Sequence, residues 1–347
     1  MLATLDSDKV IKELKALPFY QQELKALLEP HIFLRNPKRV IYFFVFLALN
    51  ISLIYSVIYF NVAWYWKLLA GICIGQFNAT LAFFAHETLH GAVFKSQRLQ
   101  HIIGTICFAP YLISPTYWRF WHNNLHHGNT QLILKDPDAF PTLSVYRRSK
   151  FMRGVFELAP GSKNPLSYFY FFYWFSFQAV LNQAHHRFGN KMWATMNHGK
   201  VTREFIFVCL MAATYCYWVG PANIVWLILI PLAVQNYIVL SYISTNHNIS
   251  PLTKINDPLE NSLTVTNNPI LEFLNLNFGY HVEHHIFPRV SSSHAKKIHE
   301  ILKTTYPTKY KYMPKWKALK YLYHTPRIYN HSSELIHPRT EEKYPTI

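Results

Sequence analysis

Residues 68–90 read LLAGICIGQFNATLAFFAHETLH. The stretch Leu68–Ala85 carries no charge, and its length is close to the roughly 20 apolar residues that a membrane-crossing helix needs. The run ends directly on His86, and His90 follows four residues later. Because residues at i and i+4 share one face of a helix, this stretch predicts a membrane helix that presents two imidazoles at its end.

Further apolar runs extend this prediction to most of the chain. The sequence is 50% hydrophobic and only 15% charged, whereas soluble domains carry about 25% charged residues. Two more uncharged runs, Val40–Phe60 and Ala222–Ser244, are long enough for spans, and a third, Phe205–Gly220, is slightly short unless it borrows a residue at either end. Ile102–Ser114 is shorter and Tyr168–Val180 is dense in aromatic rings, which favours interfacial helices. We expect an all-α integral membrane protein with four transmembrane helices in two hairpins.

Two further histidine runs follow the first. They read HNNLHH at residues 122–127 and HVEHH at residues 281–285, again with helical spacing. Neutral imidazole is the commonest protein metal ligand, and a structural zinc ion is satisfied by four ligands. Eight histidines therefore predict two metal ions. The candidates are His86, His90, His122, His126, His127, His281, His284 and His285.

The three runs can share one site only if they lie on the same side of the membrane. Four spans satisfy this condition if the two ambiguous stretches do not cross. Basic residues flank the same ends of the first two spans, at Arg35, Lys38, Arg39, Lys95 and Arg98. Under the positive-inside rule this places the histidines in a cytoplasmic cap that carries the di-metal site. His247 follows the last span in the matching position and is a ninth candidate ligand.

The chain is expected to divide into three parts. Residues 1–39 form an N-terminal cytoplasmic segment with an amphipathic helix over Ser7–Glu29, residues 40–290 the membrane domain, and residues 291–347 a basic C-terminal segment. The formal net charge is +16, but the basic residues are scattered, which argues against a nucleic-acid partner. The densest set, Lys296–Lys320, fits either anionic lipid headgroups or an acidic redox protein or acyl carrier.

A donor set made almost wholly of imidazole favours a redox-active iron pair or copper over calcium or magnesium, which prefer oxygen ligands. The three runs resemble the three histidine boxes of the membrane-bound fatty acid desaturase family. The third box, FGYHVEHHIFP at residues 278–288, is close to the family form. Order and spacing from the spans match as well, so the resemblance covers roughly residues 40–290.

The resemblance implies a di-iron centre held by the nine histidines, His247 included, with no catalytic residue beyond these ligands. Such a centre uses O2 and two electrons to introduce a C=C bond into an acyl chain on a lipid, coenzyme A or acyl carrier protein. The sequence has no His-Pro-Gly-Gly haem motif, so a separate ferredoxin or cytochrome b5 is expected to donate the electrons. The protein would lie in the plasma membrane of a bacterium or the endoplasmic reticulum of a eukaryote.

Several polar residues near the boxes are candidates to orient the ligands through the second imidazole nitrogen. The favoured set is Asp136, Asp138, Asn246 and Glu283, with Glu87 and Asp257 also considered. Some relatives carry an asparagine one turn before the extra ligand, where this chain has Ile243, which weakens the case for Asn246. Trp118 and Trp121 flank the second box and could line an acyl tunnel. The pair His185-His186 lacks a third histidine at helical spacing and is left out.

Other functions remain open at this stage. Acyl hydroxylases, acetylenases and carotenoid-modifying oxygenases carry related boxes. A metal transporter or a zinc-containing membrane receptor would also need clustered histidines. A transporter should place ionisable residues near mid-membrane, whereas the spans here are free of charge and the histidines gather at their ends.

Overall fold

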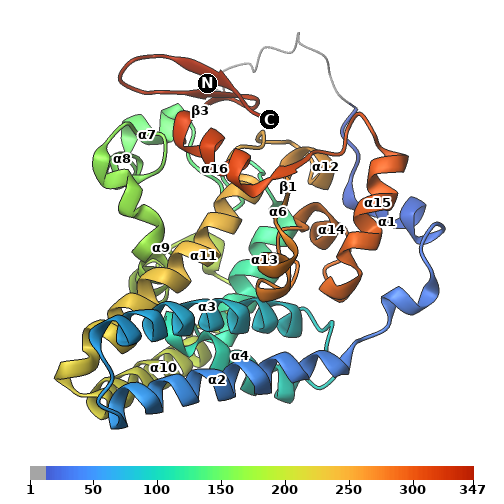
Figure 1. The fold of residues 1–347 in the computed structure, drawn as a ribbon. Coiled ribbons are helices and arrows are strands. Elements are labelled where there is room, and N and C mark those ends of the chain that lie inside the picture. The colour runs from blue at the N-terminus through green and yellow to red at the C-terminus, as the bar shows by residue number, and fades with distance from the viewer. Residues whose placement is uncertain (1–12) are drawn as a thin grey trace.

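The computed structural model describes residues 13–347, which are mostly helical (Figure 1). The α-helices are α1 Leu17–Lys25, α2 Val40–Tyr59, α3 Trp64–Leu89, α4 Gln97–Phe108, α5 Pro115–Trp118, α6 His127–Asn129, α7 Leu143–Arg148, α8 Lys150–Leu158, α9 Tyr170–Leu181, α10 His198–Val219, α11 Ile230–His247, α12 Pro258–Asn261, α13 Pro269–Leu274, α14 His281–Ile286, α15 Ala295–Thr305 and α16 Lys315–His324. Three π-helical segments are η4 Arg119–His126, η6 Asn182–His186 and η9 Val225–Leu229. Short 3-10 turns are η1 Pro30–Phe33, η2 Pro37–Arg39, η3 Ala109–Tyr111, η5 Pro165–Phe169, η7 Lys191–Trp193, η8 Pro221–Asn223 and η10 Ser292–His294.

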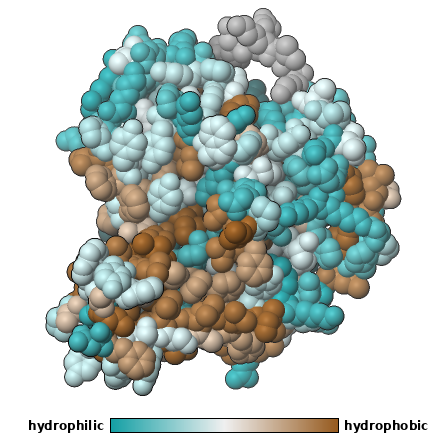
Figure 2. Space-filling view, in the orientation of Figure 1, coloured by the Kyte–Doolittle hydropathy of each residue, from teal (hydrophilic) through white to brown (hydrophobic). Residues whose placement is uncertain are grey.

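Three of the described helices are long and apolar enough to cross a membrane. They cover Pro37–Tyr59, Trp64–Leu89 and Val225–His247. These helices correspond to the first, second and fourth apolar runs of the sequence, and the second and third end among the histidines. Figure 2 shows hydrophobic residues gathered over the part of the surface where α2 and α3 run. On α2 alone, Ile41, Phe44, Leu49 and Ile51 are large apolar side chains that remain exposed.

The expected fourth span differs from these three. Phe205–Gly220 was predicted to cross the membrane, and it lies within α10, which begins at His198. The first two turns of α10 carry Lys200, Arg203 and Glu204. The uncharged remainder of the helix is shorter than the roughly 17 residues that a span needs. Four spans in two hairpins therefore stay a prediction.

The helix α3 lies at the centre of the helical bundle and packs against α2, α4 and α11. Two glycines allow its close approach to the last apolar helix. A Cβ atom at Gly71 would lie 2.5 Å from the carbonyl oxygen of Trp226, and one at Gly75 would lie 2.6 Å from Cβ of Val234. Small residues four apart are a common device for close packing of membrane helices. This packing brings the histidine-bearing ends of α3 and α11 together.

The two ambiguous apolar stretches form short helices. Ile102–Ser114 lies on α4 and η3, and Tyr168–Val180 lies on η5 and α9. Both α4 and α9 have 12 residues, too few to cross the hydrocarbon core. The helix α9 packs along α11, and α4 packs along α3.

A cap built from residues that follow α11 covers the ends of α3 and α11 (Figure 1). The fold departs here from the all-α expectation, because five three-residue strands occur within residues 13–347. The strands β1 Thr264–Thr266 and β2 Tyr312–Pro314 pair in parallel, and β3 Tyr329–His331, β4 Glu334–Ile336 and β5 Lys343–Pro345 form an antiparallel sheet. Segments this short carry too little alternation of apolar and polar residues for sequence periodicity to detect them.

The N-terminal helix is shorter than expected. Residues 7–12 of the predicted helix Ser7–Glu29 lie outside the described residues, and α1 itself covers Leu17–Lys25. Pro18 sits in the first turn of α1, where a missing N–H is tolerated, so the helix begins directly before the proline. Tyr20 and Leu24 are fully buried and pack in one cluster with Val282 and Ile286 of α14. The division at residues 39 and 290 stays a prediction.

Candidate metal centre

Nine histidines from five elements meet beneath the cap. His86 and His90 stand at the end of α3, His247 ends α11, and the other two boxes form η4 with the start of α6, and α14. Their ring nitrogens fall into two groups, in each of which the candidate ligand atoms lie within 4.8 Å of one another. The first group is His86, His90, His122, His127 and His284, and the second is His126, His247, His281 and His285.

The Nε2 atoms converge within each group. In the first, Nε2 of His122 lies 2.9 Å from Nε2 of His86 and 3.1 Å from Nε2 of His127. In the second, Nε2 of His247 lies 2.8 Å from Nε2 of His281 and 3.2 Å from Nε2 of His285. Imidazole nitrogens bind an ion such as zinc at about 2.0–2.1 Å, so two of them on one ion lie about 2.9–3.4 Å apart. Both groups therefore have spacings that suit a shared metal ion.

The π-helical turn at η4 explains how one box serves both groups. A π-helix bonds residue i to residue i+5, so His122 and His127 fall on one side and belong to the first group. His126 points to the second group, although it is the neighbour of His127. The pair His284 and His285 on α14 divides in the same way. The peptide units 126–127 and 284–285 thus connect the two groups, because each unit joins a histidine of the first group to a histidine of the second.

Oxygen atoms contact the outer nitrogens of the second group. Nδ1 of His126 lies 3.0 Å from Oδ1 of Asp136 and 3.4 Å from Oδ2 of Asp138. Nδ1 of His247 lies 3.3 Å from the carbonyl oxygen of Asn261, and Nδ1 of His285 lies 3.2 Å from Oγ1 of Thr130. Such contacts fix the ring orientation and leave Nε2 free to bind a metal. All three of these histidines are buried.

Burial also sets the protonation of the rings. It lowers the pKa of His90, His122 and His127, and does the same for His281, His284 and His285. These rings are therefore neutral at pH 7, which is the form that binds metal. Burial acts in the same direction on His126, but the carboxylates of Asp136 and Asp138 beside it together outweigh burial and raise the pKa of His126.

The structure brings only part of the expected set of orienting residues to the histidines. Glu283 turns away from the ligands beside it in the sequence: its Oε2 accepts a 2.6 Å hydrogen bond from Thr264, and its Oε1 contacts Tyr310 and His299. Both side-chain amide atoms of Asn246 are buried, with no hydrogen-bond partner in residues 13–347.

The other two carboxylates that were considered form ion pairs. Glu87 pairs with Arg39, and Asp257 pairs with Lys309. These ion pairs could not be predicted from a local motif, because Arg39 and Lys309 lie in segments far from their carboxylates in the sequence. Thr130 and Asn261 were missed by sequence reasoning. Thr130 stands four residues after His126, one helical turn further on, which is the one local signal available.

Two cavities adjoin the second box. A narrow cavity of about 40 Å³ lies against five of the histidines, and its other walls are mainly apolar. They include Ala82, Phe83, Phe108, Phe175, Val239 and Ile243. A larger cavity of about 530 Å³ runs between α8, α9 and α11. The two cavities share Trp121, Asp138, Phe175 and Ile243 as lining residues, so they are neighbours across one wall.

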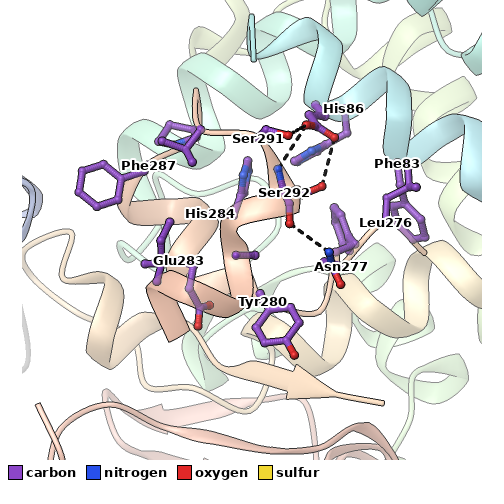
Figure 3. A pocket seen from close by; sticks show the side chains of 16 residues that line it. Phe83, His86, Leu276, Asn277, Tyr280, Glu283, His284, Phe287, Ser291 and Ser292 are labelled. Atoms are coloured by element: carbon purple, nitrogen blue, oxygen red, sulfur yellow. Dashed lines mark hydrogen bonds between the residues drawn. The ribbon is translucent and has the colours of Figure 1, made fainter. Parts of the chain in front are cut away.

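The remaining residues singled out in the sequence lie around these cavities. Trp121 lines both, and its Nε1 donates a 2.8 Å hydrogen bond to Asp138. Trp118 lines the narrow cavity but not the larger one. The pair His185-His186 lies on η6 at the larger cavity, away from both metal groups. A third cavity, drawn in Figure 3, lies between α3 and the third box and has His86 and His284 among its lining residues.

The histidine geometry agrees with comparisons with known proteins. The fatty acid desaturase family matches residues 60–316, and the chain therefore belongs to this family. It is 22% identical over 264 residues to the chloroplastic omega-6 fatty acid desaturase of Arabidopsis thaliana, a match that covers 73% of this chain and 56% of that protein. It is 29% identical over 132 residues to the sn-1 acyl-lipid omega-3 desaturase (ferredoxin) of Nostoc sp. (strain 36), with 38% and 36% covered. The matches thus span about a third to a half of these relatives.

Proposed function

We propose that this protein is a membrane-bound acyl desaturase that uses O2 and two electrons to convert a CH2–CH2 unit of an acyl chain into CH=CH. The observation that carries the proposal is the position of the narrow apolar cavity. Its wall contains His86 and His122 of the first group and His126, His247 and His281 of the second. An acyl chain in this cavity would therefore lie against both metal-binding groups.

The nine histidines are proposed to hold two iron ions. Iron fits because the donors are neutral imidazoles and because the expected reaction needs a metal that changes oxidation state. When bound, the two irons supply the oxygen-activating chemistry. The overall reaction balances as R–CH2–CH2–R′ + O2 + 2 e⁻ + 2 H⁺ giving R–CH=CH–R′ + 2 H2O.

The protein's own residues bind the substrate and exclude water. Phe83, Phe108 and Phe175 present rings around the narrow cavity, which suits an alkyl chain and leaves little room for solvent. Asp136 holds His126 through the 3.0 Å contact at Nδ1 and thereby keeps its Nε2 directed into the second group. Glu283 is proposed to fix the third box indirectly, since its hydrogen bond to Thr264 connects α14 to strand β1.

The proposed orientation places the nine histidines on the cytoplasmic side, with α10 as the fourth span. An exposed apolar surface supports a membrane role for α10, since Ile206, Phe207 and Leu210 are all exposed. The family implies an electron donor, and the Nostoc relative is named as a ferredoxin-dependent enzyme. A ferredoxin is therefore the first donor to test, and an acyl lipid the first substrate.

Expression in a host with a simple lipid profile tests this function. Mass spectrometry of the fatty acids is expected to show products 2 Da lighter than their precursors, because two hydrogen atoms leave. Products 16 Da heavier would show hydroxylation instead and would contradict desaturation. Metal analysis of the purified protein is expected to give about two irons per chain, and one zinc without iron would contradict the di-iron proposal.

A matched pair of variants separates metal binding from folding. His126→Ala removes a ligand of the second group and is expected to lower both iron content and product. His185→Ala removes a histidine of the larger cavity that belongs to neither group, and it is expected to keep both irons. Equal iron contents in the two variants would remove His126 from the proposed ligand set.

A further inference from the structure

We infer that a small acidic one-electron carrier protein docks over a basic pocket at the edge of the metal centre and delivers electrons through His90 and His127. The basic pocket is defined by the cations Arg35, Lys95, Arg119 and Arg289. The inference rests on the proposed function, because only a reaction that consumes electrons needs such a partner.

The charge of this pocket is one-sided. It has a volume of about 530 Å³, and its four cations come from four separate segments of the chain. Arg35, Lys95 and Arg289 are exposed, whereas Arg119 is half-buried. No carboxylate is among the described residues that line the pocket. A concave surface of one sign concentrates field lines and steers a partner of opposite charge.

The basic pocket opens on ligands that the acyl cavity does not use. His90 and His127 line it, and neither of them lines the narrow apolar cavity. Both belong to the first metal group. An electron carrier in this position would therefore approach the metals through one pair of imidazoles while the acyl chain occupies the other side.

Arg119 and Asn123 form one wall of the basic pocket. Nε of Arg119 and Oδ1 of Asn123 are buried and have no hydrogen-bond partner in residues 13–347. Both residues line the pocket, and the Arg119 guanidinium is held in place by a 2.8 Å hydrogen bond from Nη2 to Gln100. Buried polar groups of this kind are normally paired. Because both atoms are buried, an internal water molecule behind the pocket wall would pair with them.

In the lysine-rich C-terminal set, which the sequence suggested for docking, several lysines pair with carboxylates of the same chain. Lys303 pairs with Glu300 and Lys309 pairs with Asp257, at 3.0 and 2.7 Å. Lys311 contacts Glu260 at 3.2 Å, and Lys297 contacts Glu29. Intramolecular carboxylates thus offset much of the positive charge there. The basic pocket differs in that no carboxylate lines it and two proposed metal ligands, His90 and His127, do, which makes it the better position for delivering electrons to the metal centre.

Each turnover requires two docking events. A one-electron carrier loses one electron per encounter, so two reduced carriers are oxidised for each O2 reduced. The two electrons, two protons from solvent and the two hydrogens of the acyl chain complete the two water molecules. A partner that binds twice per cycle must also leave quickly, and electrostatic complementarity gives fast association without tight binding.

The inference is tested with iron-loaded protein in phosphatidylcholine nanodiscs, which contain no anionic lipid. The test variant is the pair Lys95→Glu and Arg289→Glu. The control is the pair Lys25→Glu and Lys254→Glu, which changes the net charge equally at two other exposed lysines. A third variant, Lys317→Glu with Lys320→Glu, tests the lysine-rich set. The measurements are the affinity for an oxidised plant-type [2Fe–2S] ferredoxin and the reoxidation rate of the reduced ferredoxin.

The pocket variant is expected to bind ferredoxin at least about tenfold more weakly, with a shallower dependence on salt. Its iron should still be reduced by dithionite as in the wild type, which shows that the metal centre is intact. The control should stay within about twofold of wild type. Wild-type binding by the pocket variant, or a loss seen only in the Lys317 and Lys320 variant, would overturn the inference. Absence of iron or product in the wild type would instead contradict the proposed function.

Discussion

Glu87 lies next to His86 in the sequence but turns away from the metal groups and forms a buried ion pair with Arg39, whose Nε is 2.8 Å from Oε2 of Glu87. Both side chains are less than a tenth exposed. Oε1 of Glu87 also accepts a 2.7 Å hydrogen bond from Ser291 and a 3.2 Å bond from the backbone N–H of Ser292. One carboxylate thus connects the start of α2, the first box and the segment after the third box.

Loss of Arg39 should destabilise the protein strongly. Arg39→Met leaves a buried carboxylate without its counter-ion, and removing one partner of such a pair costs about 3–5 kcal/mol. The measurement is the unfolding temperature of the protein in detergent, monitored by size-exclusion chromatography after heating. Arg98→Met, at an exposed arginine, is the control. Equal unfolding temperatures for the two variants would show that the ion pair does not stabilise the fold.

Asp136 is expected to govern iron affinity. Asp136→Asn keeps the shape of the side chain but removes the charge that faces Nδ1 of His126, and loss of such an orienting partner weakens metal binding by roughly 10–100-fold. Competition with a chelator measures the affinity. Asp257→Asn is the matched control, because Asp257 is also a buried carboxylate but pairs with Lys309. An unchanged iron affinity in Asp136→Asn would show that the ring is held by other contacts.

Ile243 is expected to control access of the acyl chain, because it lines both cavities. Ile243→Trp should fill the wall between them and lower product formation roughly tenfold or more, since small displacements of substrate at a reacting centre are costly. Ile243→Val, which enlarges the passage slightly, should keep activity. Fatty acid profiles and iron contents are measured together. If the tryptophan variant gives the wild-type product profile with both irons in place, the acyl chain does not pass Ile243.

A polar chain inside the helical bundle should contribute to stability. Oδ1 of Asn78 accepts a 3.0 Å hydrogen bond from Asn50, and its Nδ2 donates a 2.8 Å bond to Gln235. Asn78→Leu breaks both links between α2, α3 and α11 and is expected to cost about 0.6–2 kcal/mol. Asn61→Leu, in the exposed turn between α2 and α3, is the control. Identical denaturation midpoints for the two variants would contradict this role.

The sequence predicted the parts of the structure that depend on local patterns. Uncharged runs of about 20 residues predicted α2, α3 and α11. Helical spacing predicted that imidazoles within a box lie on one side, which holds for His86 and His90 of the first group and for His281 and His285 of the second. The stretch Phe205–Gly220 was less clear, because the helix that contains it begins with charged turns. Apolar length alone therefore could not determine its relation to the membrane.

Contacts between distant segments were not predictable from local patterns. Glu87 and Asp257 are carboxylates near histidines in the sequence, yet they form ion pairs with cations that are 48 and 52 residues away. The π-helical turn of η4 also left no recognisable signal, since the spacing of His122, His126 and His127 fits an α-helix as well. Without that turn, the division of His126 and His127 between two groups could not be foreseen.

That division has a consequence for how the protein acquires its metals. Each of the residue pairs 126–127 and 284–285 contributes one imidazole to the first group and one to the second. An ion that binds in the first group fixes His127 and His284, and so restricts the backbone of His126 and His285 before the second ion arrives. The entropic cost of ordering those neighbours is then already met. Iron uptake should therefore be cooperative, with half-loaded chains scarce even when iron is limiting.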